Sequence, residues 1–484
     1  MTEITSRTAY TNLLWRFLER FGAQGVTFIV SLVLARILDP QTYGAVAIIT
    51  VIISILQVFV DSGFGTALIQ KKESDDLDFS TVFYFNLFLS SFLYLCLFFS
   101  SPFIASFFDI SSLSLLVRIA GLLLFIFAFK NVQQAYVSKH LMFKKFFFST
   151  LIGTIGAAII GIVLALNGFG VWALIIQLLF NNAVDALILW LTVKWKPKFL
   201  FSFKRLGQLF KYGWKLLVSS LIMVTYNEAR QLVIGKMYTT EDLAHFNRGH
   251  QLPYIMTTNI NASIDSVMLP IMSRVQDDKY RVKEITRRTI RISSFVIWPM
   301  MMGLAVCSYP LIKIILTEKW LPCIPYLIIF CIAYSFYPVT TANLNAIKAI
   351  GKSGVYLILE IIKKTVGVLT LIVSMWFGPF WIAVACLFMA VFDQAVILLP
   401  NKKLLNYSII EQIKDVLPAF LLSAFMGACV YKISTFGLSE WLTLAIQVPL
   451  GIFIYIAVAY LFKVESLTYI VQQAKSFLCS KQKK

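Results

Sequence analysis

The sequence predicts an all-α polytopic membrane protein. Of its 484 residues 59% are hydrophobic and only 14% are charged, and the mean hydropathy is +0.79. Soluble domains are about 45–50% apolar and about 25% charged. Apolar runs of about 20 residues, the length that crosses a bilayer as a helix, recur along the whole chain. A transmembrane barrel would instead show short segments of alternating hydrophobicity.

The apolar runs divide the chain into about fourteen transmembrane helices, each near the ~20 residues that a bilayer requires. We expect these spans at 13–37, 43–66, 80–108, 114–138, 146–166, 171–193, 209–236, 250–274, 289–316, 324–347, 355–377, 380–400, 415–434 and 440–462.

The basic residues predict the orientation of these spans. Lys and Arg gather in every second connection, for example 194–205 and 274–288, and are sparse in the connections between them. Basic residues are enriched in the cytoplasmic loops of membrane proteins, so we expect both chain ends in the cytoplasm. Basic loops beside an anionic leaflet also account for the formal net charge of +19. No nucleic-acid partner is therefore expected.

Two segments about two hundred residues apart resemble each other. "VLARILDPQTYGA" (33–45) joins the first two spans, and "VIGKMYTTEDLAH" (233–245) joins the seventh and eighth. Both would run from the inside to the outside, so we expect parallel repeats related by a pseudo-two-fold axis along the membrane normal. Chance similarity between apolar helices is the alternative. The repeat predicts two six-helix lobes, 1–200 and 201–403, followed by two appended helices and a basic cytoplasmic tail in 404–484.

Charged residues inside the spans are the candidate site residues, because each costs about 2.5–3.5 kcal/mol at a helix centre. In the first span Arg16, Glu19 and Arg20 share one helical face. They suit a wet cleft in which the arginines bind an anionic ligand such as a diphosphate. The alternative is an interfacial start of the helix, with the arginines reaching the cytoplasmic surface.

The seventh span holds a stronger signal, because its polar residues lie deep in the predicted membrane. Asn227, Glu228 and Arg230 lie about two-thirds of the way towards the outer side, and Asp265 lies near the middle of the eighth span. One interpretation is a hydrated pocket for sugar hydroxyls or a coupling ion. The other is a structural ion pair between Arg230 and either Asp265 or Glu228. Lys215 mirrors Arg16 in the repeat and would complete a basic entrance.

Three further charged residues are weaker candidates. Asp185 and Asp393 are isolated intramembrane acids that suit proton or sodium coupling, and Arg118 lies near the predicted outer surface. Arg118 is a substrate-binding candidate, with anchoring at the interface as the alternative.

Several familiar motifs are absent or out of context. "GFGVWA" (168–173) has dinucleotide-site spacing but falls in a turn between membrane helices, and no Walker A sequence occurs. No His or Cys spacing matches a metal site. We expect no catalytic residue, metal or cofactor. The small residues Gly153, Ala157, Gly161 and Ala165 recur every four positions, which predicts a groove for close helix packing.

Three segments carry a resemblance to a known family: "ARILDPQTYGAVAIITVIISILQVFVDSGFGTALIQKK" (35–72), "QQAYVSKHLMFKKF" (133–146) and "ANLNAIKAIGKSGVYLILEIIKK" (342–364). They resemble polysaccharide transport proteins of the Wzx flippase type, which belong to the multidrug/oligosaccharidyl-lipid/polysaccharide (MOP) exporter superfamily. The resemblance implies a V-shaped molecule of two lobes. It also implies flipping of undecaprenyl-diphosphate-linked oligosaccharide from the inner to the outer leaflet by alternating access, for O-antigen, capsule or exopolysaccharide synthesis.

The expected partners are therefore a polyprenyl-diphosphate-linked oligosaccharide, membrane lipids, a coupling ion (H⁺ or Na⁺), a polysaccharide polymerase and a chain-length regulator. The expected location is the cytoplasmic (inner) membrane. One alternative is an ion-coupled multidrug or small-solute antiporter of the same superfamily, for which we would expect twelve spans. Another is a membrane glycosyltransferase or polysaccharide polymerase, which would normally carry a large external loop with catalytic carboxylates.

Overall fold

The computed structural model describes residues 6–61, 63–71, 73–470 and 472, and the side chains of these residues except 6–21, 212, 263, 266 and 353. Within them the chain is α-helical and contains no strand, which confirms the predicted fold class. Contacts divide it into two compact units, Met1–Ala244 and His245–Lys484. The three predicted parts, 1–200, 201–403 and 404–484, were derived from the repeat and stay a prediction.

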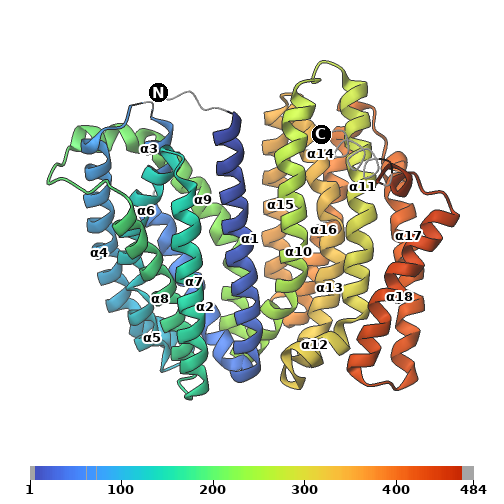
Figure 1. The fold of residues 1–484 in the computed structure, drawn as a ribbon, viewed down its shortest axis with the longest axis horizontal. Helices are drawn as coiled ribbons and strands as arrows, with labels where there is room; N and C mark the ends of the chain where they lie inside the picture. Colours follow the sequence, from blue (N-terminus) through green and yellow to red (C-terminus); the bar gives the residue numbers. More distant parts are fainter. Residues whose placement is uncertain (1–5, 62, 72, 471, 473–484) are drawn as a thin grey trace. The chain divides into compact units, whose positions relative to one another are not determined.

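The helices of the first unit follow one another with short connections, drawn blue to green in Figure 1. They are α1 (Ser6–Ile37), α2 (Pro40–Asp61), α3 (Phe64–Gln70), α4 (Asp76–Phe107), α5 (Leu113–Ala120), α6 (Leu123–Lys139), α7 (Phe143–Leu166), α8 (Val171–Thr192) and α9 (Phe203–Met237).

The helices of the second unit are drawn yellow-green to red in Figure 1, and the first of them begins at the end of the first unit. They are α10 (Thr240–Ser273), α11 (Lys279–Val306), α12 (Ser308–Leu316), α13 (Ile324–Ser335), α14 (Tyr337–Ala349), α15 (Ser353–Ser374), α16 (Pro379–Leu405), α17 (Ile409–Ile433) and α18 (Glu440–Leu461), with short 3₁₀ helices at Glu318–Cys323 and Ser434–Phe436.

Each predicted span falls on one helix or on two consecutive helices. Among the described residues, ten helical stretches are both long and apolar enough to cross a membrane. The helices α9, α10 and α15 are also long, at 35, 34 and 22 residues, but they are not among the ten. Each of the three carries charged side chains within its length, for example Glu360, Lys363 and Lys364 in α15. The total of fourteen crossings and the orientation stay predictions.

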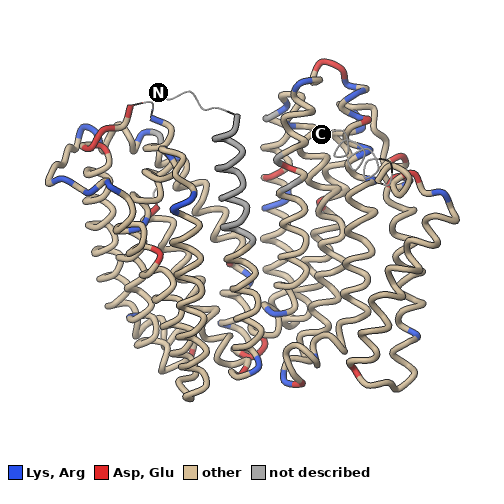
Figure 2. The backbone as a smooth tube through the Cα atoms, in the orientation of Figure 1, with Lys and Arg blue, Asp and Glu red and all other residues tan. Residues whose placement is uncertain are grey.

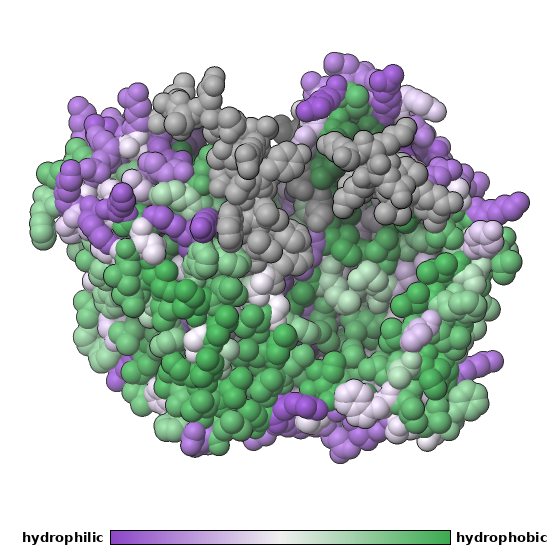
Figure 3. Space-filling model, viewed as in Figure 1, coloured by the Kyte–Doolittle hydropathy of each residue, from purple (hydrophilic) through white to green (hydrophobic). Residues whose placement is uncertain are grey.

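Ion pairs show which connections lie at the same end of each unit. In the first unit Lys198 pairs with Asp76 at 2.6 Å, and Lys236 pairs with Asp109 at 3.0 Å. The first pair joins two predicted inner connections, and the second joins two predicted outer ones. Figure 2 shows charged residues concentrated towards the helix ends, and Figure 3 shows hydrophobic residues over the middle of each unit. The grouping of connections therefore agrees with the alternation of the spans.

The start of α4 illustrates how the sequence fixes a helix end. The Asp75 side chain accepts from the Asp78 amide at 2.9 Å, and the Asp78 side chain accepts from the Asp75 amide at 3.2 Å. This reciprocal pair is a capping box, which satisfies two backbone donors. The hydrogen bond from the Asp78 amide also holds the pKa of the Asp75 carboxyl below its ordinary value. Asp78 is fully buried, and the Lys71 ammonium lies 2.5 Å from the same Asp78 oxygen, Oδ2.

The predicted small-residue groove is a packing surface between α7 and α8. Ala157 and Ala165 are buried, and a Cβ atom placed on Gly161 would lie 3.0 Å from the Gln177 side chain. On Gly153 it would lie 3.0 Å from the Asn181 backbone oxygen. Small residues let two membrane helices approach closely, as the spacing predicts.

The two similar segments adopt the same local structure. A two-residue break separates α1 from α2 after Ile37, and another separates α9 from α10 after Met237. The breaks also lie close together, because a Cβ atom on Gly44 would stand 1.8 Å from the backbone oxygen of Thr240. Only a residue without a Cβ atom fits this approach.

Candidate functional site

A polar face runs along the middle of α2. Thr50, Ser54 and Gln57 follow one another at helical spacing, so they share one side of the helix. Thr50 lies about 15 Å along the helix from Pro40, which places it near the centre of an apolar span. Thr50 and Ser54 donate their hydroxyl protons to carbonyl groups of their own helix. Their oxygen lone pairs remain able to accept from a ligand.

This face lines a cavity of about 240 Å³ inside the first unit. The other lining residues come from α2, α6, α8 and α9, and they are Val51, Ile53, Leu123, Phe127, Leu178, Glu228 and Gln231. A cavity of this size has room for several water molecules. The hydrated pocket at Glu228 stays a prediction.

Glu228 is the acidic group of this cavity. Its side chain is half-buried and accepts a short hydrogen bond from Gln231 one turn later on α9. Among the described residues it has no ion-pair partner. An ionised carboxylate in a low-dielectric site is costly without a cation, and it lowers that cost by binding a proton or a positive ion. Binding of a proton or a small cation at Glu228 stays a prediction.

A second polar cluster in the same unit is already neutralised. Lys130 on α6 pairs with Asp185 on α8 at 2.7 Å and donates to Asn182 at 3.2 Å. Both charged side chains are largely buried, with 15% and 8% of their surfaces exposed. Asn131, the next residue, donates a short hydrogen bond to Asp61. Asp185 therefore has a charged partner, Lys130, and its role in ion coupling stays a prediction.

Lys130 was missed in the sequence analysis, although it lies inside the predicted fourth span. The signal was present, because a lysine in an apolar run is as conspicuous as the aspartates that were singled out. What the sequence did not provide was the rotation of α6, which points this lysine towards α8.

The other predicted residues of α9 differ in how much of their side chains is exposed. Lys215 and Asn227 are exposed, and Arg230 is half-buried with its guanidinium 5.4 Å from the centre of the Tyr226 ring. The side chains of Arg16, Glu19 and Arg20 lie outside the described residues, so their role stays a prediction.

Arg118 is bound within the first unit. Its Nε donates to the Ser101 hydroxyl at 2.7 Å, and its guanidinium lies 4.2 Å from the centre of the Phe98 ring. These contacts join α5 to α4 and favour the anchoring interpretation over substrate binding.

In the second unit, the predicted acids lie on separate helices. Asp265 on α10 is exposed, and Asp393 on α16 is half-buried. Next to Asp393, Gln394 donates to the backbone oxygen of Phe336 at 3.1 Å and to the Thr340 hydroxyl. The expected pairing of Arg230 with Asp265 stays a prediction.

The second unit also contains a charged cluster that sequence reasoning did not assemble. Asp415, whose side chain is 1% exposed, accepts from Arg287 Nε at 2.9 Å, Arg291 Nε at 2.7 Å and the Tyr407 hydroxyl at 2.6 Å. Burial and the neighbouring Asp415 carboxylate raise the pKa of Tyr407. The arginines lie one turn apart on α11, but only the fold brings α17 beside them. The cluster joins α11 to α17, and the two arginines neutralise the charge of Asp415.

No group of three or more His, Cys, Asp or Glu side chains suited to a metal ion occurs within the described part of the chain. The chemistry of the candidate site therefore rests on one carboxyl group, two carboxamides and two hydroxyls in an apolar surrounding.

Comparisons with known proteins agree with this architecture. Residues 33–325 match the model of a family described as "Polysaccharide biosynthesis protein". The succinoglycan biosynthesis transport protein ExoT of Rhizobium meliloti (strain 1021) is 22% identical over 352 residues, which are 73% of this chain and 71% of that protein. The teichuronic acid biosynthesis protein TuaB of Bacillus subtilis (strain 168) is 24% identical over 415 residues, or 83% and 84% of the two chains.

Among solved structures, the lipid II flippase MurJ in an inward closed conformation superimposes with a TM-score of 0.77. The match covers 93% of this chain and 98% of that chain at 18% identity, which is a likeness of fold.

The helices and the intramembrane polar cavity define a multi-pass membrane protein with the fold of a transporter. Because the family model covers more than half of the sequence, the chain belongs to the polysaccharide biosynthesis protein family, as a Wzx-type transport protein of the MOP superfamily. The resemblance seen in the sequence is thereby confirmed.

Proposed function

We propose that this protein is a flippase that moves polyprenyl-diphosphate-linked oligosaccharide units from the inner to the outer leaflet of the cytoplasmic membrane. A diphosphate and several sugars cannot cross about 30 Å of hydrocarbon without a polar path. Family membership supports this function, and so do the names of the relatives, which refer to succinoglycan transport and teichuronic acid synthesis. A polymerase and a chain-length regulator are the partners that would use the exported units.

The observation that carries the proposal is the cavity around Glu228. A half-buried acid without a positive partner among the described residues, beside amides and hydroxyls at the centre of a span, costs stability. We assign Glu228 as the coupling acid, which binds a proton or Na⁺ as the transporter changes conformation. Arg16, Arg20, Lys215 and Arg230 are assigned to the substrate diphosphate, because cations hold phosphate oxygens by charge-assisted hydrogen bonds.

The test uses Glu228→Gln in cells from which the chromosomal gene has been deleted. Glutamine keeps a hydrogen-bonding partner for Gln231 but cannot ionise. We expect glycan export to fall at least tenfold, with lipid-linked oligosaccharide accumulating in the inner leaflet at unchanged protein level. In vesicles, the remaining transport should lose its response to an imposed pH or Na⁺ gradient.

The matched control is Glu73→Gln, since Glu73 is exposed in the connection between α3 and α4. Gradient-driven transport by Glu228→Gln at the wild-type rate would remove Glu228 from the coupling site. If deletion of the gene leaves glycan export intact but sensitises cells to small cationic compounds, the protein is an antiporter instead.

A further inference from the structure

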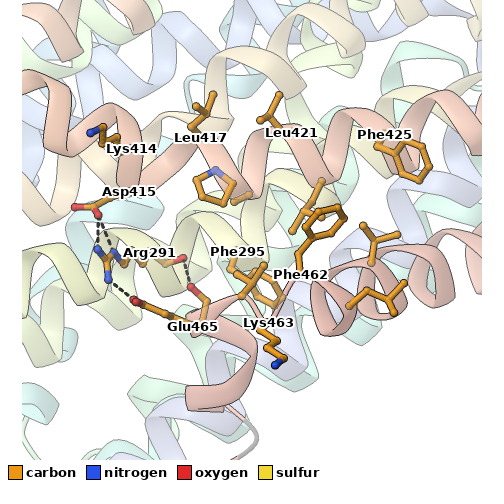
Figure 4. Close-up of a pocket in the computed structure, with 17 residues that line it drawn as sticks. Arg291, Phe295, Lys414, Asp415, Leu417, Leu421, Phe425, Phe462, Lys463 and Glu465 are labelled. Atoms are coloured by element: carbon orange, nitrogen blue, oxygen red, sulfur yellow. Dashed lines mark hydrogen bonds and ion pairs between the residues drawn. The ribbon is translucent and has the colours of Figure 1, made fainter.

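A second and larger cavity, of about 910 Å³, lies in the second unit between α11, α17 and α18. Figure 4 shows its two parts, a charged group around Arg291 and Asp415 and an apolar wall that includes Leu417, Leu421 and Phe425. This division into a polar end and an apolar body matches a lipid better than a sugar or an ion.

The apolar wall is open to the surroundings of the protein. Leu421, Phe425, Leu461 and Phe462 are exposed over 54–76% of their surfaces. In a helix bundle that spans a membrane, such side chains contact hydrocarbon. The apolar part of the cavity therefore opens to the lipid phase, from which an acyl chain can enter.

Two of the cations that line the cavity are not neutralised by any described residue. Arg291 is engaged by Asp415 at 2.7 Å and by Glu465. Lys414 and Lys463 also line the cavity, are exposed, and have no ion-pair partner among the described residues. They are the groups available to an anionic ligand, and they lie near the basic end of the unit, where the positive-inside rule places the cytoplasm.

The backbone fixes Lys463 at the end of α18. The Lys463 amide donates to the Tyr460 carbonyl at 3.1 Å, and the Val464 amide donates to the Ala459 carbonyl at 3.0 Å. These two bonds form a Schellman motif, in which the residue at the Lys463 position is left-handed and is usually glycine. Lys463 has a φ of 50°. Glycine would be less strained at this position, so a change of Lys463 to glycine removes the charge without disturbing the helix end.

We propose that this cavity binds an anionic phospholipid of the cytoplasmic leaflet. Lys414 and Lys463 contact its phosphate, and one acyl chain lies along α17 and α18. The bound lipid fills the space between α11, α17 and α18. This proposal does not depend on the proposed flippase function.

Native mass spectrometry of the full-length protein, delipidated and then incubated with defined lipids, tests the proposal. We expect phosphatidylglycerol to bind at least tenfold more tightly than phosphatidylcholine. The double variant Lys414→Gln/Lys463→Gly should lose this preference, although glycine suits the helix end and should leave the fold intact. Leu421→Trp, which narrows the apolar wall, should weaken binding of both lipids.

The control is Lys432→Gln, the same change at the opposite end of α17, which should bind phosphatidylglycerol like the wild type. Equal binding of both phospholipids by the wild type, or unchanged binding by the double variant, would refute recognition of an anionic headgroup. Stronger binding of undecaprenyl phosphate than of phosphatidylglycerol would assign the cavity to the transported lipid. If inorganic phosphate binds as tightly as phosphatidylglycerol and displaces it, the cavity is a site for free anions and not for a lipid.

Discussion

The pair formed by Lys130 and Asp185 shows how the first unit accommodates charge within its spans. The two groups lie 2.7 Å apart and are mostly buried, so each charge lowers the free-energy cost of burying the other. Glu228, in the same unit, has no such partner within the part of the chain that the structure describes. This difference separates a charge that stabilises helix packing from one that is available for transport.

We predict that Asp185→Ala will strongly reduce the amount of folded protein, because it leaves the Lys130 ammonium buried without a counter-charge. Removing one partner of a buried pair costs about 3–5 kcal/mol. The double variant Lys130→Met/Asp185→Leu should restore the folded fraction, measured by size-exclusion chromatography of a fluorescent fusion. If the double variant is folded but transports nothing, Asp185 or Lys130 has a role beyond pairing.

At the scale of helices, the contact between the two similar turns restricts position 44 to glycine. The Gly44 position faces backbone atoms of Thr240, which cannot move without shifting the start of α10. The contact therefore couples the first turn of α2 to the connection that leads out of the first unit.

We predict that Gly44→Ala will destabilise the protein by at least about 1–3 kcal/mol, the usual cost of overpacking. Its thermal midpoint in detergent should fall clearly below that of the wild type. Gly65→Ala is the matched control, because Gly65 also lies in a helix but has nothing within 4 Å of its missing Cβ atom. An unchanged midpoint for Gly44→Ala would mean that the two turns do not approach so closely.

The helices themselves were largely predictable, because apolar runs interrupted by basic connections encode both length and position. Gly153 and Gly161 were correctly assigned to packing, since a four-residue spacing of small side chains needs no knowledge of the partner helix. The Glu228 cavity was only partly foreseen. Gln57 and Ser54 have ordinary polar side chains on α2, and only the rotation of α2 against α9 makes them neighbours of Glu228. The Asp415 cluster was not predicted, because it also depends on how helices pack against each other.

On the scale of the whole molecule, the alternation of basic connections indicates which ends of the helices face the cytoplasm. Ion pairs place Lys198 with Asp76 and Lys236 with Asp109, so predicted inner and outer connections gather at separate ends of the first unit. The second unit repeats this arrangement, with Lys283 near Glu411 at 3.0 Å and Lys313 near Glu440 at 2.7 Å.

We predict that reporter fusions after Lys204 and after Arg281 will read as cytoplasmic, because these connections hold the basic excess. Fusions at Asn167 and at Thr240 should read as external. Alkaline phosphatase and green fluorescent protein, which are active on opposite sides, provide the measurement. A consistent reversal at one of these sites would overturn the alternation on which the fourteen-span topology depends.

The composition of α9 has a consequence for how the protein is made. This helix carries Lys215, Glu228 and Arg230 and does not reach the hydropathy of an independent span. Each such charge adds about 2.5–3.5 kcal/mol to the cost of insertion at a helix centre. We therefore expect α9 to enter the membrane together with a neighbour that shields its polar face. Since α9 packs on α2, which is synthesised much earlier, we expect the first unit to assemble while the ribosome is still adding the second.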